Sequence, residues 1–157
     1  MNQKLTTMKL TRHEEKFDES IERALQSAWM DCPSAEDTIK RLKTLILVKG
    51  KEYRRNNDPY HNFIQGGKIA RVRPMAVLNF FRLKHKISVS DLEQDFEDKK
   101  FVDLHQVNEK FNDILVYTLI ELAYVESEGE TSFAVYREFM SELNRKLNFT
   151  ALINARD

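Results

Sequence analysis

Two short stretches in the middle of the chain carry side chains suited to binding a base and a phosphate group. Lys49 and Tyr53 are four residues apart, so they share one face if a helix continues through them. Asn62 and Phe63 follow a run of turn-forming residues. In one interpretation Phe63 stacks on a base, Asn62 hydrogen-bonds to its edge and Lys49 meets phosphate. In the other, the two aromatic residues belong to the core and the lysine is solvated.

A third stretch, from Lys84 to Asp91, is predicted to join two helices. Ser88 is a good N-cap, and Asp91 three residues later completes the capping pattern. A helix that begins at Ser88 would offer free backbone N–H groups and the positive end of its dipole to an anion. Lys84 and His85 would strengthen that site. The alternative is an ordinary capped helix with basic residues on the preceding turn.

Two carboxylates lie one turn apart further along the chain. Glu109 and Asp113 have the i, i+4 spacing, and Tyr117 follows one turn later. Such a pair can share a Mg²⁺ ion that takes phosphate oxygens and waters as its other ligands, and Asp91 is a candidate third ligand. The alternative is a solvated helix face. The sequence has no glycine-rich phosphate loop, zinc-ligand spacing or nucleophile elbow.

The elements that position these residues are predicted to be helices. Only four glycines and three prolines interrupt 157 residues, and apolar residues recur at three- and four-residue spacing. Residues 54–67, rich in turn formers, are predicted to be an irregular functional loop. The tails 1–12 and 148–157 are polar, and the tail beyond Asn148 is expected to be loosely held. The chain is therefore predicted to be one all-α domain, 1–157, a bundle of about five to six helices. Their expected ranges are 14–30, 34–49 (or 34–53), 74–86, a short helix capped by Ser88, 103–125 (or 105–125) and 133–147.

Composition restricts the partners. Residues 49–86 hold 10 basic and 2 acidic side chains, a net charge of +8, whereas residues 87–157 hold 7 and 15, a net charge of −8. This acidic remainder argues against a nucleic acid partner. A single cysteine, Cys32, forms no internal disulfide, and no apolar run approaches the roughly 20 residues that span a bilayer. We expect a soluble protein of the cytoplasm that does not enter membranes.

Four motifs in this order resemble the nucleotide modification associated, or MazG-like, family of phages and bacteria. They are Lys49-x-x-x-Tyr53, Asn62-Phe63, Lys84-His85-x-x-Ser88-x-x-Asp91 and Glu109-Lys110-x-x-Asp113-x-x-x-Tyr117. The resemblance covers residues 49–125. It implies an all-α fold like that of nucleoside triphosphate pyrophosphatases and a nucleotide-related role in phage biology, in which case the location is the host cytoplasm.

Three functions follow from these observations. The first is a nucleotide-binding protein that hydrolyses a nucleoside triphosphate to monophosphate and pyrophosphate, with Mg²⁺ on Glu109, Asp113 and Asp91. The second is a binder that sequesters a nucleotide without turnover. The third is a helical interaction module, including one that binds nucleic acid through the basic residues 49–86. Symmetric pairing into a homo-oligomer is also expected, because short helical domains often complete their bundle in this way.

Overall fold

A computed structural model describes residues 12–53, 55 and 58–156, with side chains described at 14–48, 55 and 58–156. Within these ranges the chain forms six α-helices, one 3-10 helix and no β-strand, which confirms the predicted all-α bundle. The helices are α1 (Arg12–Asp31), η1 (Pro33–Ala35), α2 (Glu36–Tyr53), α3 (His61–Ala70), α4 (Pro74–Glu97), α5 (Leu104–Ser127) and α6 (Phe133–Arg156). None of the described helices is long and apolar enough to cross a membrane.

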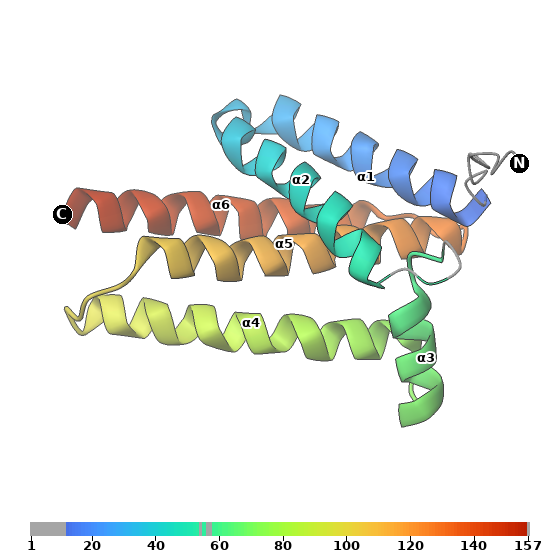
Figure 1. Ribbon diagram of the computed structural model, residues 1–157. Coiled ribbons are helices and arrows are strands. Elements are labelled where there is room, and N and C mark those ends of the chain that lie inside the picture. Colours follow the sequence, from blue (N-terminus) through green and yellow to red (C-terminus); the bar gives the residue numbers. More distant parts are fainter. Residues whose placement is uncertain (1–11, 54, 56–57, 157) are drawn as a thin grey trace, which may run out of the picture.

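Helix α5 lies at the centre of the bundle. It runs beside α4 and α6, while the α1–α2 hairpin packs across it and α3 stands nearly perpendicular at one end (Figure 1). Every residue from 111 to 120 is buried, because α1, α2, α4 and α6 all contact this helix. The predicted start of this helix is confirmed, since the Asp103 side chain accepts a hydrogen bond of 3.0 Å from the His105 backbone N–H as its N-cap.

The hydrophobic interior is divided into two clusters along the bundle. The larger one, here called the main core, joins all six α-helices and includes Phe17, Leu42, Phe63, Leu115 and Phe139. The smaller one, here called the distal core, joins only α4, α5, α6 and the α4–α5 connection. It consists of Val89, Leu92, Val102, Val107, Phe111, Ile114, Phe149 and Ile153.

The prediction of an irregular loop over 54–67 is wrong for its second half, because α3 begins at His61. Gly66 and Gly67 lie inside this helix, where they permit close packing and do not form a turn. A Cβ atom on Gly67 would lie 2.7 Å from the Val72 carbonyl oxygen, and one on Gly66 would lie 3.1 Å from the Val77 side chain. Glycine is therefore required at position 67, where the chain turns back along α3 to start α4, whereas at position 66 the Val77 side chain would have to shift slightly.

The predicted boundary at Ser88 is also wrong. Helix α4 is continuous from Pro74 to Glu97, and Ser88 donates its hydroxyl hydrogen bond to the Lys84 carbonyl oxygen at 3.1 Å. A serine within a helix commonly satisfies its hydroxyl in this way, so a good capping residue does not by itself end a helix. Buried Leu78 and Val89 continue one inward stripe through the expected break.

Helix α6 extends nine residues beyond the predicted end at Leu147, to Arg156. Phe149 and Ile153 pack into the distal core, and the Arg156 guanidinium donates to the Phe96 and Lys100 carbonyl oxygens at 2.6 and 2.5 Å. The segment predicted to be a loose tail thus closes the end of the bundle, because its apolar residues have the helical spacing that buries them.

Candidate functional site

A polar cleft of about 800 Å³ lies between α2, α5 and α6. Its lining residues recur at three- and four-residue spacing on each helix, so each helix turns one polar face toward the cleft. They are Asp37, Thr38, Arg41 and Leu45 from α2, His105, Asn108, Glu109, Asn112 and Asp113 from α5, and Lys146, Leu147 and Thr150 from α6.

The most unusual of these side chains is Lys146, which is only 6% exposed. Its Nζ donates hydrogen bonds to Thr38 Oγ1 at 3.1 Å and Asn112 Oδ1 at 3.0 Å. Both acceptors are neutral, and no described carboxylate forms an ion pair with it. Burial lowers the pKa of Lys146 from its ordinary value of 10.5 to about 8. A buried cation without a charged partner is costly in a structural role, and such groups gather at functional sites.

The rest of the cleft carries both signs of charge. Arg41 lines it from α2, and Glu109 and Asp113 line it from one face of α5. The His105 Nε2 atom lies 3.9 Å from Glu109 Oε2, and both side chains are largely exposed. The cleft therefore combines cations that suit phosphate oxygens with carboxylates that suit a divalent cation.

Asp113 also connects the cleft to a row of aromatic rings on its other side. Its Oδ2 atom lies 3.5 Å from His85 Nδ1 of α4. The His85 ring stacks on Tyr117 with centroids 5.8 Å apart, and Tyr117 stacks on Phe81 at 6.1 Å. Phe81 then meets Phe63 edge to face at 6.2 Å. The fold thus brings Phe63, His85, Asp113 and Tyr117, predicted from separate motifs, into one contiguous set.

The first predicted pair, Lys49 and Tyr53, belongs to the last turns of α2, but their side chains lie outside the described residues. Of the second pair, Asn62 is exposed on the first turn of α3. Phe63 is 1% exposed and belongs to the main core, so the core interpretation describes it and base stacking does not.

The predicted anion site around Ser88 does not form, because no helix begins there. Lys84 is exposed on α4, whereas His85 turns inward to Asp113. Asp91 is exposed on α4 and does not line the cleft that holds Glu109 and Asp113. Among the described side chains, no group of three or more His, Cys, Asp or Glu residues is arranged to hold a metal ion. Glu109 and Asp113 do share the cleft as a pair.

Sequence reasoning missed Lys146, Thr38, Arg41 and Asn112. A signal for Lys146 was present, since it interrupts the stripe of Phe139, Leu143, Phe149 and Ile153 that faces inward along α6. A lysine on an apolar stripe points to a buried cation. The signal is visible only when α6 is continued past Leu147, because the two residues that complete the stripe lie beyond it.

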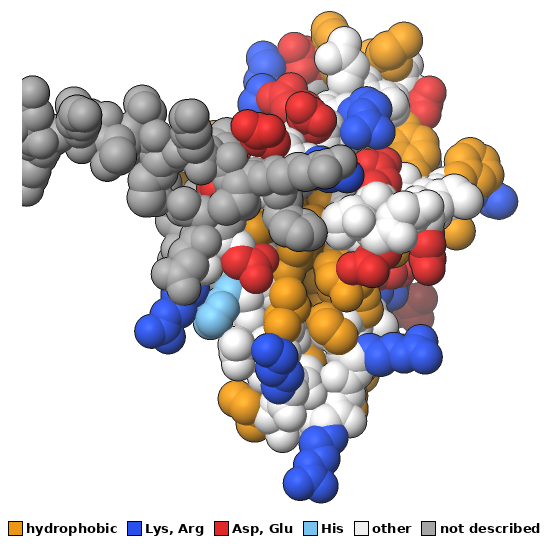
Figure 2. All heavy atoms as spheres, turned by 90° about the vertical axis from the view of Figure 1, so that its right-hand side faces the viewer, with side chains coloured by type: hydrophobic (Ala, Val, Ile, Leu, Met, Phe, Trp, Pro, Cys, Tyr) orange, Lys and Arg blue, Asp and Glu red, His pale blue; other side chains and the backbone are white. Residues whose placement is uncertain are grey.

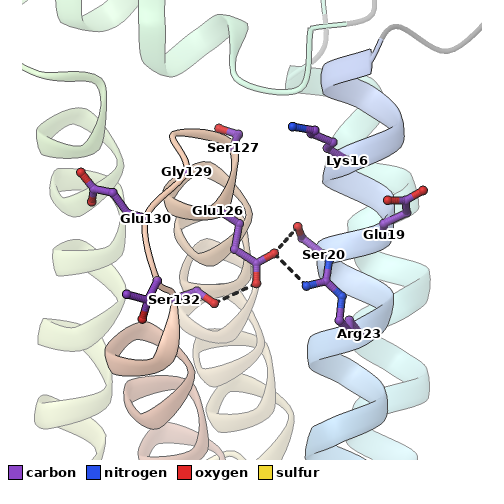
Figure 3. A pocket seen from close by; sticks show the side chains of 10 residues that line it. Lys16, Glu19, Ser20, Arg23, Glu126, Ser127, Gly129, Glu130 and Ser132 are labelled. Atoms are coloured by element: carbon purple, nitrogen blue, oxygen red, sulfur yellow. Dashed lines mark hydrogen bonds and ion pairs between the residues drawn. The ribbon is translucent and has the colours of Figure 1, made fainter.

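A second hollow, of about 440 Å³, lies where α1 meets the α5–α6 turn. Its central carboxylate, Glu126, is held by three partners (Figure 3): the hydroxyl groups of Ser20 and Ser132 donate to it, and Arg23 Nη1 lies 3.5 Å away. Because these partners already satisfy the Glu126 carboxylate, its role is structural. Its contacts, here called the Glu126 clamp, hold α1 against α5 and α6.

Comparison of the chain with models of protein families, with curated proteins and with solved structures finds no match.

Proposed function

We propose that this protein binds a phosphorylated small molecule, a nucleotide in the first instance, in the cleft between α2, α5 and α6. The observation that carries the proposal is Lys146, a buried cation whose described partners are two neutral oxygens. A phosphate oxygen at this position would supply a negative charge that the described partners of Lys146 lack, and Arg41 from α2 would add a second cation. The choice of a nucleotide over other phosphates is supported by the resemblance of residues 49–125 to MazG-like proteins.

A second candidate function is hydrolysis of a nucleoside triphosphate to monophosphate and pyrophosphate. It is favoured by the two carboxylates that line the same cleft as Lys146. Glu109 and Asp113 offer the oxygen ligands that Mg²⁺ takes, and one or two carboxylates suffice when phosphate oxygens and waters complete the shell. Bound there, Mg²⁺ would supply positive charge to phosphate oxygens and lower the pKa of a bound water. Lys146 and Arg41 would orient the phosphate chain, and His85 would hold the Asp113 carboxylate in place.

Calorimetry with nucleoside mono-, di- and triphosphates and inorganic pyrophosphate, with and without Mg²⁺, tests the binding proposal. The informative variant is Lys146→Met, which keeps the length of the side chain and removes its charge. Loss of one charged hydrogen bond costs about 1.5–3 kcal/mol, so we expect affinity to fall roughly 10- to 100-fold. Lys40→Met is the matched control, since Lys40 is an exposed lysine of α2 paired with Glu36. Equal affinity of wild type and Lys146→Met for every ligand would refute this site.

Release of pyrophosphate separates the hydrolase from a binder that sequesters its ligand. A hydrolase requires Mg²⁺ for turnover and loses it in Asp113→Asn, while circular dichroism shows an intact helical fold. A binder gives no turnover and binds with an affinity that ignores Mg²⁺. Binding to duplex DNA that weakens steeply with salt, together with no binding of free nucleotides, would favour the interaction module instead.

A further inference from the structure

Helix α4 has a second apolar face that the bundle does not use. Its inward face carries Leu78, Val89 and Leu92, whereas Phe80, Leu83 and Ile87 follow one another on the opposite side at three- and four-residue spacing. These three side chains are 61%, 50% and 54% exposed. In Figure 1, α4 forms the lower edge of the bundle, and no other helix of the described residues lies along its outer side. This unpartnered stripe, here called the outer face of α4, is the kind of patch that marks an interaction surface.

The apolar surface continues at both ends of α4. Ile69 in the last turn of α3 is 84% exposed, and Phe101 in the connection to α5 is 89% exposed. At roughly 200 Å² per phenylalanine side chain, Phe80 and Phe101 alone expose on the order of 300 Å². Ile69, Leu83 and Ile87 add to this exposed area. If two copies each bury all five side chains, the total buried area approaches the roughly 1,200 Å² at the lower end of specific interfaces.

Charge along this surface is polarised from one end of α4 to the other. Exposed Lys68, Arg71 and Arg73 precede the helix, and Figure 2 shows Lys and Arg side chains, without Asp or Glu, over the lower part of this end of the molecule. The last two turns and the C-cap carry Asp91, Asp95, Glu97 and Asp98. Lys99 and Lys100 follow, and Lys100 lies 4.0 Å from Asp95. The segment before the helix is basic and the end of the helix is acidic, so in an antiparallel pair each basic segment lies beside the partner's acidic end.

We propose that the outer face of α4 binds a second copy of this chain, with the two α4 helices antiparallel about a two-fold axis near the helix midpoint. In that register Leu83 of each copy lies opposite the partner's Ile87, and Arg73 lies opposite the partner's Asp98. A two-fold axis repeats each contact, so the apolar stripe of each copy covers that of the other, and the basic end of each copy meets the partner's acidic end. The projecting α3 of each copy then covers the partner's exposed Phe101.

Sedimentation equilibrium of the full chain tests this proposal. Wild type is expected to be a dimer, and Leu83→Asp combined with Ile87→Asp is expected to be a monomer with unchanged helical content by circular dichroism. Leu47→Asp is the matched control, because Leu47 is an exposed leucine, 59% accessible, on α2. A monomeric wild type, or a dimer that persists in the double variant, overturns the proposal, as does dissociation in Leu47→Asp to the same extent.

A charge-swap experiment tests the antiparallel register. Arg73→Glu and Asp98→Lys each place like charges opposite one another twice in a homodimer, so each variant alone is expected to dimerise more weakly than wild type. Mixed together, they restore one Glu–Lys and one Arg–Asp contact per pair, and the heterodimer is expected to form at wild-type strength. Failure of the mixture to form heterodimers, or dimerisation of either variant at wild-type strength, overturns the register.

Discussion

Lys146 makes a prediction that requires no knowledge of the ligand. In the folded protein its pKa is lowered to about 8 by burial, against an ordinary value of 10.5. Below pH 8 the Lys146 side chain is protonated in both the folded and the unfolded chain, so it does not make the free energy of unfolding depend on pH. Between pH 8 and 10.5 only the unfolded chain holds the proton, so the free energy of unfolding rises with pH. At 1.36 kcal/mol per unit, the rise across this window is about 3 kcal/mol.

Urea unfolding followed by circular dichroism at a series of pH values measures this slope. Tyr60 and Tyr136 act in the opposite direction above pH 10, because burial raises their pKa values. Their contribution is removed by plotting the difference in unfolding free energy between wild type and Lys146→Met. That difference is expected to be flat below pH 8 and to rise above it in favour of wild type. Lys146→Arg is the control, since arginine keeps its charge and adds no slope.

Parallel pH curves for wild type and Lys146→Met would refute the reasoning. They would mean that the ammonium group keeps its ordinary pKa in the folded protein and therefore reaches solvent or a carboxylate. The argument that an anion completes its surroundings would then fall with it.

Three further predictions follow from contacts described above. Calorimetry should show that the affinity of wild type for ATP falls as the pH rises through about 8, because only the protonated lysine attracts phosphate. The affinity of Lys146→Arg should stay level over the same range, and an equal fall in both proteins would contradict this prediction. Gly67→Ala should lower the free energy of unfolding, measured in urea, by about 2 kcal/mol or more, because the new Cβ meets backbone atoms. Gly66→Ala should lower it less, because its Cβ meets only the movable Val77 side chain. The reverse order would refute the close-packing explanation. Glu126→Gln should destabilise the fold by about 1–3 kcal/mol through the weakened clamp on α1, seen as faster amide exchange in α1 than in α4; uniform exchange would count against it.

Most of the helical framework followed from local signals. Apolar spacing predicted α1, α5 and the start of α6, and the start expected at Asp103 or His105 agrees with α5, which begins at Leu104. The errors came from residues whose local preference gives way to tertiary packing. Ser88 satisfies its hydroxyl inside α4, and Gly66 and Gly67 allow close approach inside α3. Neither outcome is encoded in a window of a few residues.

The candidate cleft could be predicted only in part. Glu109 and Asp113 were found because their spacing is a property of one helix. Lys146 and Thr38 are 108 positions apart and meet only after α2 and α6 have both packed against α5. The same limit applies to the contact between His85 and Asp113, since both residues were singled out but the distance that joins them depends on how α4 packs against α5.

The cleft also marks the boundary between the two hydrophobic cores. On α5, Asn112 and Asp113 lie between Phe111 and Ile114 of the distal core, and the main core begins at the next residue, Leu115. On α6, Lys146 lies between Leu143 of the main core and Phe149 of the distal core. A polar layer at this place weakens the cooperativity between the two halves, so the distal three-helix end should open at lower free energy than the rest. A molecule bound across that layer would couple the two halves. Its binding would then be detected as slower amide exchange in the C-terminal part of α4, which belongs to the distal core.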